Sequence, residues 1–302
     1  MAVVNNGLPI WLGSLIAFVY GTVVGSFLNV CIYRIPAEES IVDPPSHCPK
    51  CNTKLRPLDN VPLLAFLWLG RKCRYCKAPI SWRYFSVELL TGLLWVATYL
   101  RYGISIDVFV YVLFISALLV AFFVDLDHFI IPDQVVIAGL VLGVGKDIAH
   151  WIAGSLHLVR IPLPFTDFKL PLPPSIVGMV VCFGVFYLIA FVSYYAFRPK
   201  DKAEQETYEG AMGGGDVKLA AGIGAVVGVL PALVSFFIAV VLGTVVGVTY
   251  VMLQARAEKR GMPWRTEIPF GPYMVVGALA VILVYPQLTG LWSAWVRMIT
   301  PG

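Results

Sequence analysis

Residues 108–124 read VFVYVLFISALLVAFFV, and Asp125 follows them directly. This run contains no charged residue. Its composition is that of a helix that crosses the hydrocarbon core of a bilayer, for which about 20 apolar residues are needed. An ionisable residue at the edge of such a run is costly to place beside lipid, and where one occurs it is a functional candidate. Asp125 is therefore the first residue that the sequence singles out.

The composition of the whole chain agrees with a membrane protein. Of its 302 residues 59% are hydrophobic and 13% are charged, against about 25% charged in an ordinary soluble domain. The net charge of +4 is too small to indicate a nucleic-acid partner. We expect an all-α polytopic fold surrounded by a lipid bilayer.

About eight transmembrane helices are expected from the apolar segments. The run from Leu219 to Met252 is too long for one crossing, so we divide it at Pro231, where proline would interrupt the helical hydrogen bonds. The other expected spans are Ile10–Tyr33, Tyr84–Leu100, Val108–Val124, Val135 to about Ala153, Ser175–Phe197 and Tyr273 to about Trp295.

The basic residues predict the orientation. The segment 34–83 is rich in Lys and Arg, and short basic loops stay in the cytoplasm. With eight spans, the basic loops Arg198–Lys218 and Arg256–Arg265 fall on the same side, and both termini face the periplasm. The predicted division is a first transmembrane helix (1–33), a cytoplasmic loop (34–83) and a transmembrane core (84–302).

Two CxxC pairs lie in the cytoplasmic loop. Cys48 and Cys51 are followed, after 21 residues, by Cys73 and Cys76. Two such turns can complete a tetrahedron of thiolates, which is the pattern of a zinc ribbon. Because four ligands leave no open coordination position, we expect a structural zinc that supplies folding energy to the loop.

Other uses of these cysteines remain open. A redox or disulfide role is disfavoured in the reducing cytoplasm, and a loop without metal is the remaining alternative. Cys31 and Cys182 lie inside apolar runs and are expected to be small buried hydrophobic residues.

Acidic residues gather at two span boundaries. The first cluster holds Asp125, Asp127 and Asp133, and the second is Gly213-Gly214-Gly215-Asp216. In the eight-span topology both clusters reach the cytoplasmic boundary of the membrane, so they could meet in one site.

Helical geometry ranks the first cluster. Asp125 directly follows the apolar run and is the deepest of the three. Asp127 lies about 200° around a helix from Asp125 and cannot share its face. Asp133 follows a proline and precedes an apolar segment, as a helix N-cap does. Asp125 is the preferred catalytic candidate, with Asp127 and Asp133 as alternatives, and nearby His128 either tunes Asp125 or sits at the interface.

Asp216 also has a structural alternative, as the N-cap of the next helix with Lys218 reaching to the interface. The three preceding glycines favour a functional role, because they suit a positive φ or a close approach to the main chain. A substrate backbone beside Asp216 would use such an approach. Two carboxylates at one desolvated site share a proton, which is the state that acid–base hydrolysis of a peptide bond needs.

Several motifs together resemble the type IV prepilin peptidases, which belong to the GxGD class of intramembrane aspartic proteases. The resemblance spans nearly the whole chain and includes the two CxxC pairs. The other motifs are Gly25-Ser26-Phe27-Leu28-Asn29-Val30 with Arg34-Ile35-Pro36, Trp82-Arg83-Tyr84 with Glu88, Asp125-Leu126-Asp127 with Ile131-Pro132-Asp133, Gly213-Gly214-Gly215-Asp216-Val217-Lys218, and Ile268-Pro269-Phe270-Gly271-Pro272-Tyr273.

The resemblance implies that Asp125 and Asp216 are the catalytic pair of a bacterial inner-membrane enzyme. It implies prepilins or type II secretion pseudopilins as substrates, cut after a glycine at the cytoplasmic face. Members with a cysteine loop are typically also N-methyltransferases that use S-adenosylmethionine. That second activity rests on the resemblance alone, and no residue of this chain is assigned to the methyl donor.

Two other functions compete with this one. A transporter or an assembly scaffold would need a path of charges across the membrane, and no charged residue at mid-depth continues one from the two clusters. The sequence does not distinguish the preferred function from that of a related protease that has another substrate or lacks the methylation activity.

Overall fold

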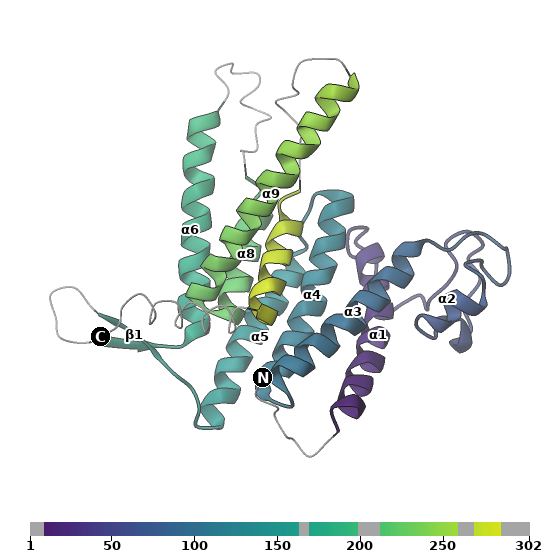
Figure 1. Cartoon of the computed structure of the whole chain (residues 1–302), viewed down its shortest axis with the longest axis horizontal. Coiled ribbons are helices and arrows are strands. Elements are labelled where there is room, and N and C mark those ends of the chain that lie inside the picture. Colours follow the sequence, from purple (N-terminus) through teal and green to yellow (C-terminus); the bar gives the residue numbers. More distant parts are fainter. Residues whose placement is uncertain (1–8, 163–168, 199–211, 259–268, 285–302) are drawn as a thin grey trace, which may run out of the picture. The chain divides into compact units, whose positions relative to one another are not determined.

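The computed structural model describes residues 9–162, 169–198, 212–258 and 269–284, and within them it is mostly helical (Figure 1). The chain divides into two compact units, Met1–His128 and Phe129–Gly302. Several segments for which we made predictions lie outside the described residues. They are the two termini, most of the basic loops Arg198–Lys218 and Arg256–Arg265, and the end of the last expected span.

The first unit is built on three long helices, α1 (Ile10–Arg34), α3 (Trp82–Tyr102) and α4 (Ile106–His128). Helices α1 and α3 lie side by side (Figure 1). They approach closely because α1 has no side chain at Gly25, where a Cβ atom would lie 2.8 Å from the Cα atom of Glu88. Helix α4 packs on both and fills the core with fully buried Phe114 and Leu118.

The segment between α1 and α3 contains only short elements, the 3-10 helix η1 (Pro57–Asn60) and α2 (Leu64–Trp68). Isolated antiparallel bridges join His47 to Lys54 and Lys72 to Pro79. Each bridge encloses one CxxC turn. Phe66 of α2 packs its ring against Trp82 and Phe85 of α3, which fastens the segment to the helices.

The second unit holds α5 (Asp133–Ile152), α6 (Pro174–Phe197), α8 (Gly214–Val227) and α9 (Val229–Glu258), and a further helix Gly271–Val284. Helix α8 is buried along most of its length because it packs on both α5 and α6. Strands β1 (Val159–Pro162) and β2 (Lys169–Leu172) form an antiparallel pair with Val159 opposite Leu172. This small sheet departs from the all-α prediction.

The predicted division at Pro231 is wrong. The break between α8 and α9 lies at Gly228, whose φ of 84° ends α8. Such a φ strains residues with a Cβ atom, so glycine is the natural stop signal. Pro231 lies in the first turn of α9, where its missing N–H would have no helical partner in any case.

Among the described residues, five helices are long and apolar enough to cross a membrane: Ile10–Arg34, Ile106–His128, Asp133–Ile152, Pro174–Ala196 and Val229–Leu253. They match five of the expected spans. Helix α3 is long enough, but polar and charged residues such as Glu88 and Arg101 make it less apolar. Helix α8 has 14 residues, a length of about 21 Å, which is shorter than the hydrocarbon core. The total of eight crossings stays a prediction.

Candidate functional site

Asp125 lies in the last turn of α4, because the helix continues past the apolar run to His128. It is only 5% exposed and follows Val124, which is fully buried. This burial agrees with the ranking made from the sequence.

Asp127 lies on the opposite, exposed face of the same helix and forms an ion pair with Arg83 of α3. The exposed side-chain fractions of Arg83 and Asp127 are 34% and 39%. Asp127 therefore has a structural partner that accounts for its charge. The sequence motif contained Arg83 but gave no signal of this role, because the partners are 44 positions apart.

Asp133 is the first residue of α5 and not its N-cap, which is Pro132. Its Oδ1 atom accepts a hydrogen bond from Lys218 Nζ at 2.7 Å, and both side chains are exposed. The prediction of Asp133 as the N-cap is therefore wrong, whereas the prediction that Lys218 reaches to the interface stays a prediction. The ion pair links the starts of α5 and α8.

Asp216 lies in the first turn of α8 and is 9% exposed. The N-cap position belongs to Gly213, which has no side chain to cap with, so the alternative of Asp216 as the N-cap is wrong. The first turn still suits an acid, because the unpaired N–H groups of a helix N-terminus attract negative charge.

The three glycines before Asp216 do not adopt a positive φ. Gly213 is the cap, and Gly214 and Gly215 already belong to α8. A Cβ atom at Gly215 would lie 3.1 Å from Ile131 Cβ, whereas one at Gly214 would meet open space. The glycines therefore serve close approach at Gly215 and leave the main chain uncovered at Gly214.

Asp125 belongs to the first unit and Asp216 to the second. Both side chains are buried, whereas those of Asp127 and Asp133 are exposed. That Asp125 and Asp216 act as one pair stays a prediction. His128 is exposed at the end of α4, and its role also stays a prediction.

The four loop cysteines lie together, and the two CxxC turns share one conformation. The N–H of Cys48 donates to the carbonyl of Thr53, and the N–H of Cys73 donates to that of Ala78. The residue after each turn has a positive φ, 53° at Asn52 and 60° at Lys77. Each turn is thus a knuckle that points two sulfurs to the same side.

The sulfur positions fit a metal ion of the expected kind. Four ligands at about 2.3 Å in a zinc tetrahedron lie about 3.8 Å from one another. The Sγ atoms of Cys48 and Cys76 are 3.8 Å apart, and all four sulfurs lie within 4.8 Å of one another. The cluster can therefore hold a metal ion, and none of the six cysteines of the chain is in a disulfide.

Thiolates are favoured in part of this cluster. The side chain of Thr53 hydrogen-bonds Cys51 Sγ at 3.3 Å and, with the Thr53 backbone, lowers the pKa of Cys51 to about 6. Hydrogen bonding from the backbone of Cys76 lowers the pKa of Cys73. The lowered pKa values of Cys51 and Cys73 match the deprotonated form that binds metal. Although a backbone hydrogen bond from Ala78 lowers it, the pKa of Cys76 is raised to about 11 by desolvation and by hydrogen bonds with the other three cysteines.

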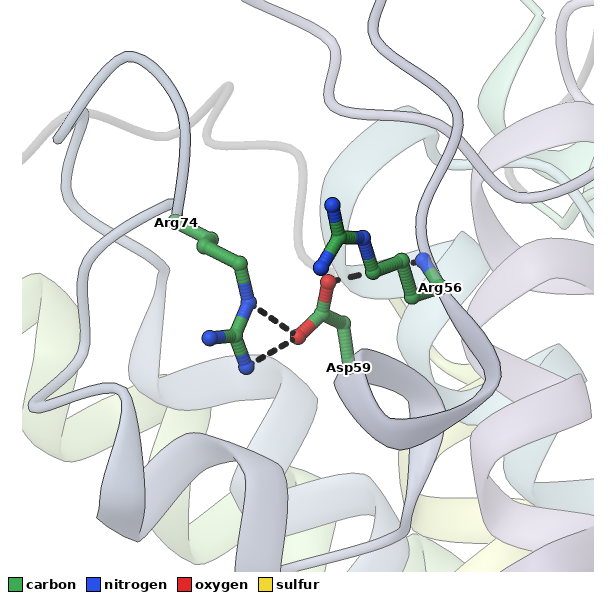
Figure 2. A network of polar contacts seen from close by, with 3 residues as sticks. All are labelled: Arg56, Asp59 and Arg74. Atoms are coloured by element: carbon green, nitrogen blue, oxygen red, sulfur yellow. Dashed lines mark hydrogen bonds and ion pairs between the residues drawn. The ribbon is translucent and has the colours of Figure 1, made fainter.

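An ion pair supports the second knuckle (Figure 2). Asp59 Oδ1 accepts from Arg74 at 2.8 Å (Nε) and 2.7 Å (the second nitrogen), and the N–H of Arg56 donates to Oδ2 at 3.4 Å. The hydrogen bond from Arg74 holds the pKa of Asp59 below its usual range. Because Arg74 lies between Cys73 and Cys76, this contact positions the metal turn against η1.

Two further buried polar residues, Asn29 and Glu88, received no functional role in the sequence analysis. Asn29 of α1 donates from Nδ2 to the carbonyl of Tyr84 at 3.1 Å, and Glu88 of α3 accepts from the N–H of Leu63 at 2.7 Å. Both side chains are buried. Asn29 and Glu88 were each part of a family motif, but only the packing of α1, α3 and the loop brings them together.

Comparisons with known proteins agree over most of the chain. Residues 19–102 match the model of the bacterial peptidase A24 N-terminal domain, and residues 112–248 match that of the type IV leader peptidase family. Relatives named prepilin leader peptidase/N-methyltransferase come from Myxococcus xanthus (29% identity, 99% of both chains), Bacillus subtilis (30%, 94% of this chain and 98% of the relative) and Stutzerimonas stutzeri (32%, 94% and 95%). No solved structure matches the chain.

Proposed function

Because the chain belongs to the type IV leader peptidase family, we propose that it is an intramembrane aspartic endopeptidase that removes the leader of type IV prepilins or type II secretion pseudopilins. Membership makes the chain a peptidase, and the names of its relatives point to prepilin processing. Cleavage is proposed after a glycine, at the cytoplasmic face of the bacterial inner membrane.

One observation carries the assignment of Asp125 and Asp216. Of the four aspartates in the two motif clusters, these two are buried, whereas Asp127 and Asp133 are exposed and form ion pairs with Arg83 and Lys218. A buried acid is costly unless it serves a purpose, and a pair of acids with one shared proton serves hydrolysis.

The reaction follows from this pair. The ionised aspartate takes a proton from water while the water oxygen attacks the scissile carbonyl carbon. The protonated aspartate donates its proton to the departing amine, so the bond between carbon and nitrogen breaks and a carboxylic acid and an amine are released. The uncovered main chain at Gly214 supports the approach of an extended substrate beside Asp216.

The new N-terminal amine is the proposed methyl acceptor, as the names of the relatives suggest. S-Adenosylmethionine, when bound, would supply the methyl group, and the amine would lose a proton as it accepts that group. We assign zinc, held by Cys48, Cys51, Cys73 and Cys76, a structural role in the loop beside this chemistry.

The proposed topology has eight crossings, with the loop and both carboxylates at the cytoplasmic side and both termini in the periplasm. The basic residues of the loop support this orientation.

Mass spectrometry of a reconstituted reaction tests the proposal. The purified chain in lipid is incubated with a prepilin-like peptide that has a basic leader, a glycine and an apolar helix, with S-adenosylmethionine present. We expect a cut directly after the glycine and a mass gain of one methyl group on the new N-terminus. A cut elsewhere, or no cut, contradicts the proposed specificity, and a cut without the mass gain contradicts the second activity.

A further inference from the structure

Strands β1 and β2, between α5 and α6, have two faces of opposite character. Successive side chains of a strand point to opposite sides, so the antiparallel register decides which side chains share a face. One face carries only aliphatic side chains, paired as Val159 with Leu172 and Ile161 with Leu170. The other carries two basic residues and two prolines, paired as Arg160 with Pro171 and Pro162 with Lys169. The pair of strands is therefore amphipathic.

The aliphatic face is only partly covered by the protein. Val159 and Leu170 are 37% and 36% exposed, and Ile161 and Leu172 are half-buried. Among the described elements, each strand packs mainly on the other. A two-stranded hairpin is marginally stable in water unless another layer covers its apolar face. The aliphatic face thus needs a surface to rest on.

The nearest surface follows from the connections of the strands. Only Pro173 separates Leu172 from α6, and a strand of four residues spans about 13 Å, so both strands stay close to the end of this helix. They run sideways from that end of α6 (Figure 1). Helices α5 and α6 are both long and apolar enough to cross a membrane. The strands therefore start where α6 would leave the bilayer.

The end of α5 carries a residue typical of a membrane interface. Trp151 is 70% exposed, one position before the helix ends at Ile152. Tryptophan gathers at the level of the lipid headgroups, where its ring is partly apolar and its N–H meets polar groups. Trp151 and the strands thus indicate the same depth, the boundary between headgroups and acyl chains.

The charge of the second face selects the kind of lipid. Arg160 and Lys169 are exposed and, within the described part of the chain, form no ion pair. Neither strand contains an acidic residue. An amphipathic segment with its apolar face in the acyl boundary holds its basic side chains at the level of the lipid phosphates. Two unpaired cations at that level favour anionic headgroups.

We propose that the hairpin of β1 and β2 lies in the headgroup region of an anionic lipid leaflet. Its aliphatic face turns to the acyl chains, and Arg160 and Lys169 bind lipid phosphates. This surface lies outside the candidate active site, and the inference holds for either side of the membrane. It gives α5 and α6, the helices on which α8 packs, an anchor in the lipid.

Fluorescence quenching in lipid nanodiscs tests where the aliphatic face lies. A small fluorescent amino acid replaces Leu170, on the aliphatic face, or its neighbour Pro171, on the opposite face, in the full-length, zinc-loaded chain. The discs contain phosphatidylcholine and phosphatidylglycerol with bromine on the upper part of their acyl chains. We expect bromine to quench the probe at position 170 at least about threefold more than the probe at position 171, because only the aliphatic face enters the acyl boundary.

Bromine on one lipid class at a time tests the selection of anionic lipid. With the probe at position 170, brominated phosphatidylglycerol should quench about twofold more than brominated phosphatidylcholine at equal content. The double variant Arg160→Gln/Lys169→Gln should lose this difference, because each basic residue strengthens attraction to an anionic surface by about fivefold. Arg198→Gln, which removes an exposed charge at the other end of α6, is the matched control and should keep it.

The other outcomes overturn the proposal. If neither probe is quenched, the strands stand in water, and if both are quenched equally, no face is turned to the acyl chains. If the signal at position 170 depends on the number of chains per disc and not on bromine, the aliphatic face binds a second copy. If quenching is the same for both lipid classes in wild type, the selection of anionic lipid is wrong. Zinc content and thermal unfolding verify that each variant is folded.

Discussion

Arg83, in the first turn of α3, forms an ion pair with Asp127, in the last turn of α4. The pair joins two helices of the first unit two residues beyond the buried Asp125. We expect Arg83→Gln and Asp127→Asn each to destabilise the folded chain slightly, with a coupling of about 0.2–1 kcal/mol, because both side chains are partly exposed.

A double-mutant cycle of thermal or denaturant unfolding measures this coupling. Glu38→Gln, which removes an exposed charge from the loop, is the control. Additive effects of the two substitutions would mean that the pair contributes nothing, and Asp127 would return as a catalytic alternative.

The cysteine cluster predicts one metal ion per chain. Replacement of Cys48, Cys51, Cys73 or Cys76 by alanine should lower the bound zinc far below one equivalent, because the tetrahedron loses a ligand. Cys31→Ala and Cys182→Ala are matched controls, since both residues are buried in helices and neither belongs to the cluster. Elemental analysis of the purified variants measures this, and full zinc content in a loop variant would refute the assigned ligand.

Removal of the metal should unfold the loop but leave the long helices. Between α1 and α3 only η1 and α2 are regular, so little apolar core remains without the metal. After chelation we expect rapid proteolysis within residues 35–81 and protection of the two units' long helices. Equal protection of the loop with and without chelator would contradict a structural metal.

The ion pair of Asp59 and Arg74 predicts a defined pH dependence. The hydrogen bond from Arg74 lowers the pKa of Asp59, so its stabilisation is complete above the usual pKa of Asp and is lost as the pH falls through the lowered value. Asp59→Asn should therefore destabilise the loop by about 1 kcal/mol equally at pH 7 and pH 5, because Arg74 is partly exposed.

Unfolding of the zinc-loaded wild type and Asp59→Asn at both pH values provides the measurement, with Asp43→Asn as the control for an exposed loop acid. A difference between wild type and variant that has vanished by pH 5 would show that the pair does not form.

The sequence predicted those features that depend on local composition. The apolar runs gave five helices that the structure confirms as long and apolar enough to cross a membrane. The CxxC spacing predicted the cysteine cluster, because each turn is local. The apolar run before Asp125 indicated its burial, and the helical repeat indicated that Asp127 lies on another face of the helix.

Features that depend on packing were missed. We predicted the helix break at Pro231, but it lies at Gly228. Proline is the stronger signal of a helix end in a sequence, yet it is tolerated in the first turn of a helix, where Pro231 lies. The ion pairs of Asp127 and Asp133 join residues distant in the chain. Glu88 could not be recognised as part of a cavity, since its surroundings come from α1, the loop and α3.

Cleavage of a prepilin-like peptide by four single variants tests the central claim most directly. Asp125→Asn and Asp216→Asn keep the size of the side chain and remove its acid–base chemistry, and Asp127→Asn and Asp133→Asn are the matched exposed controls. We expect the first two, although folded, to lose cleavage by at least about a hundredfold, as for the loss of a general acid or base, and the two controls to keep cleaving. Retained cleavage by folded Asp125→Asn or Asp216→Asn would contradict the paired-aspartate mechanism.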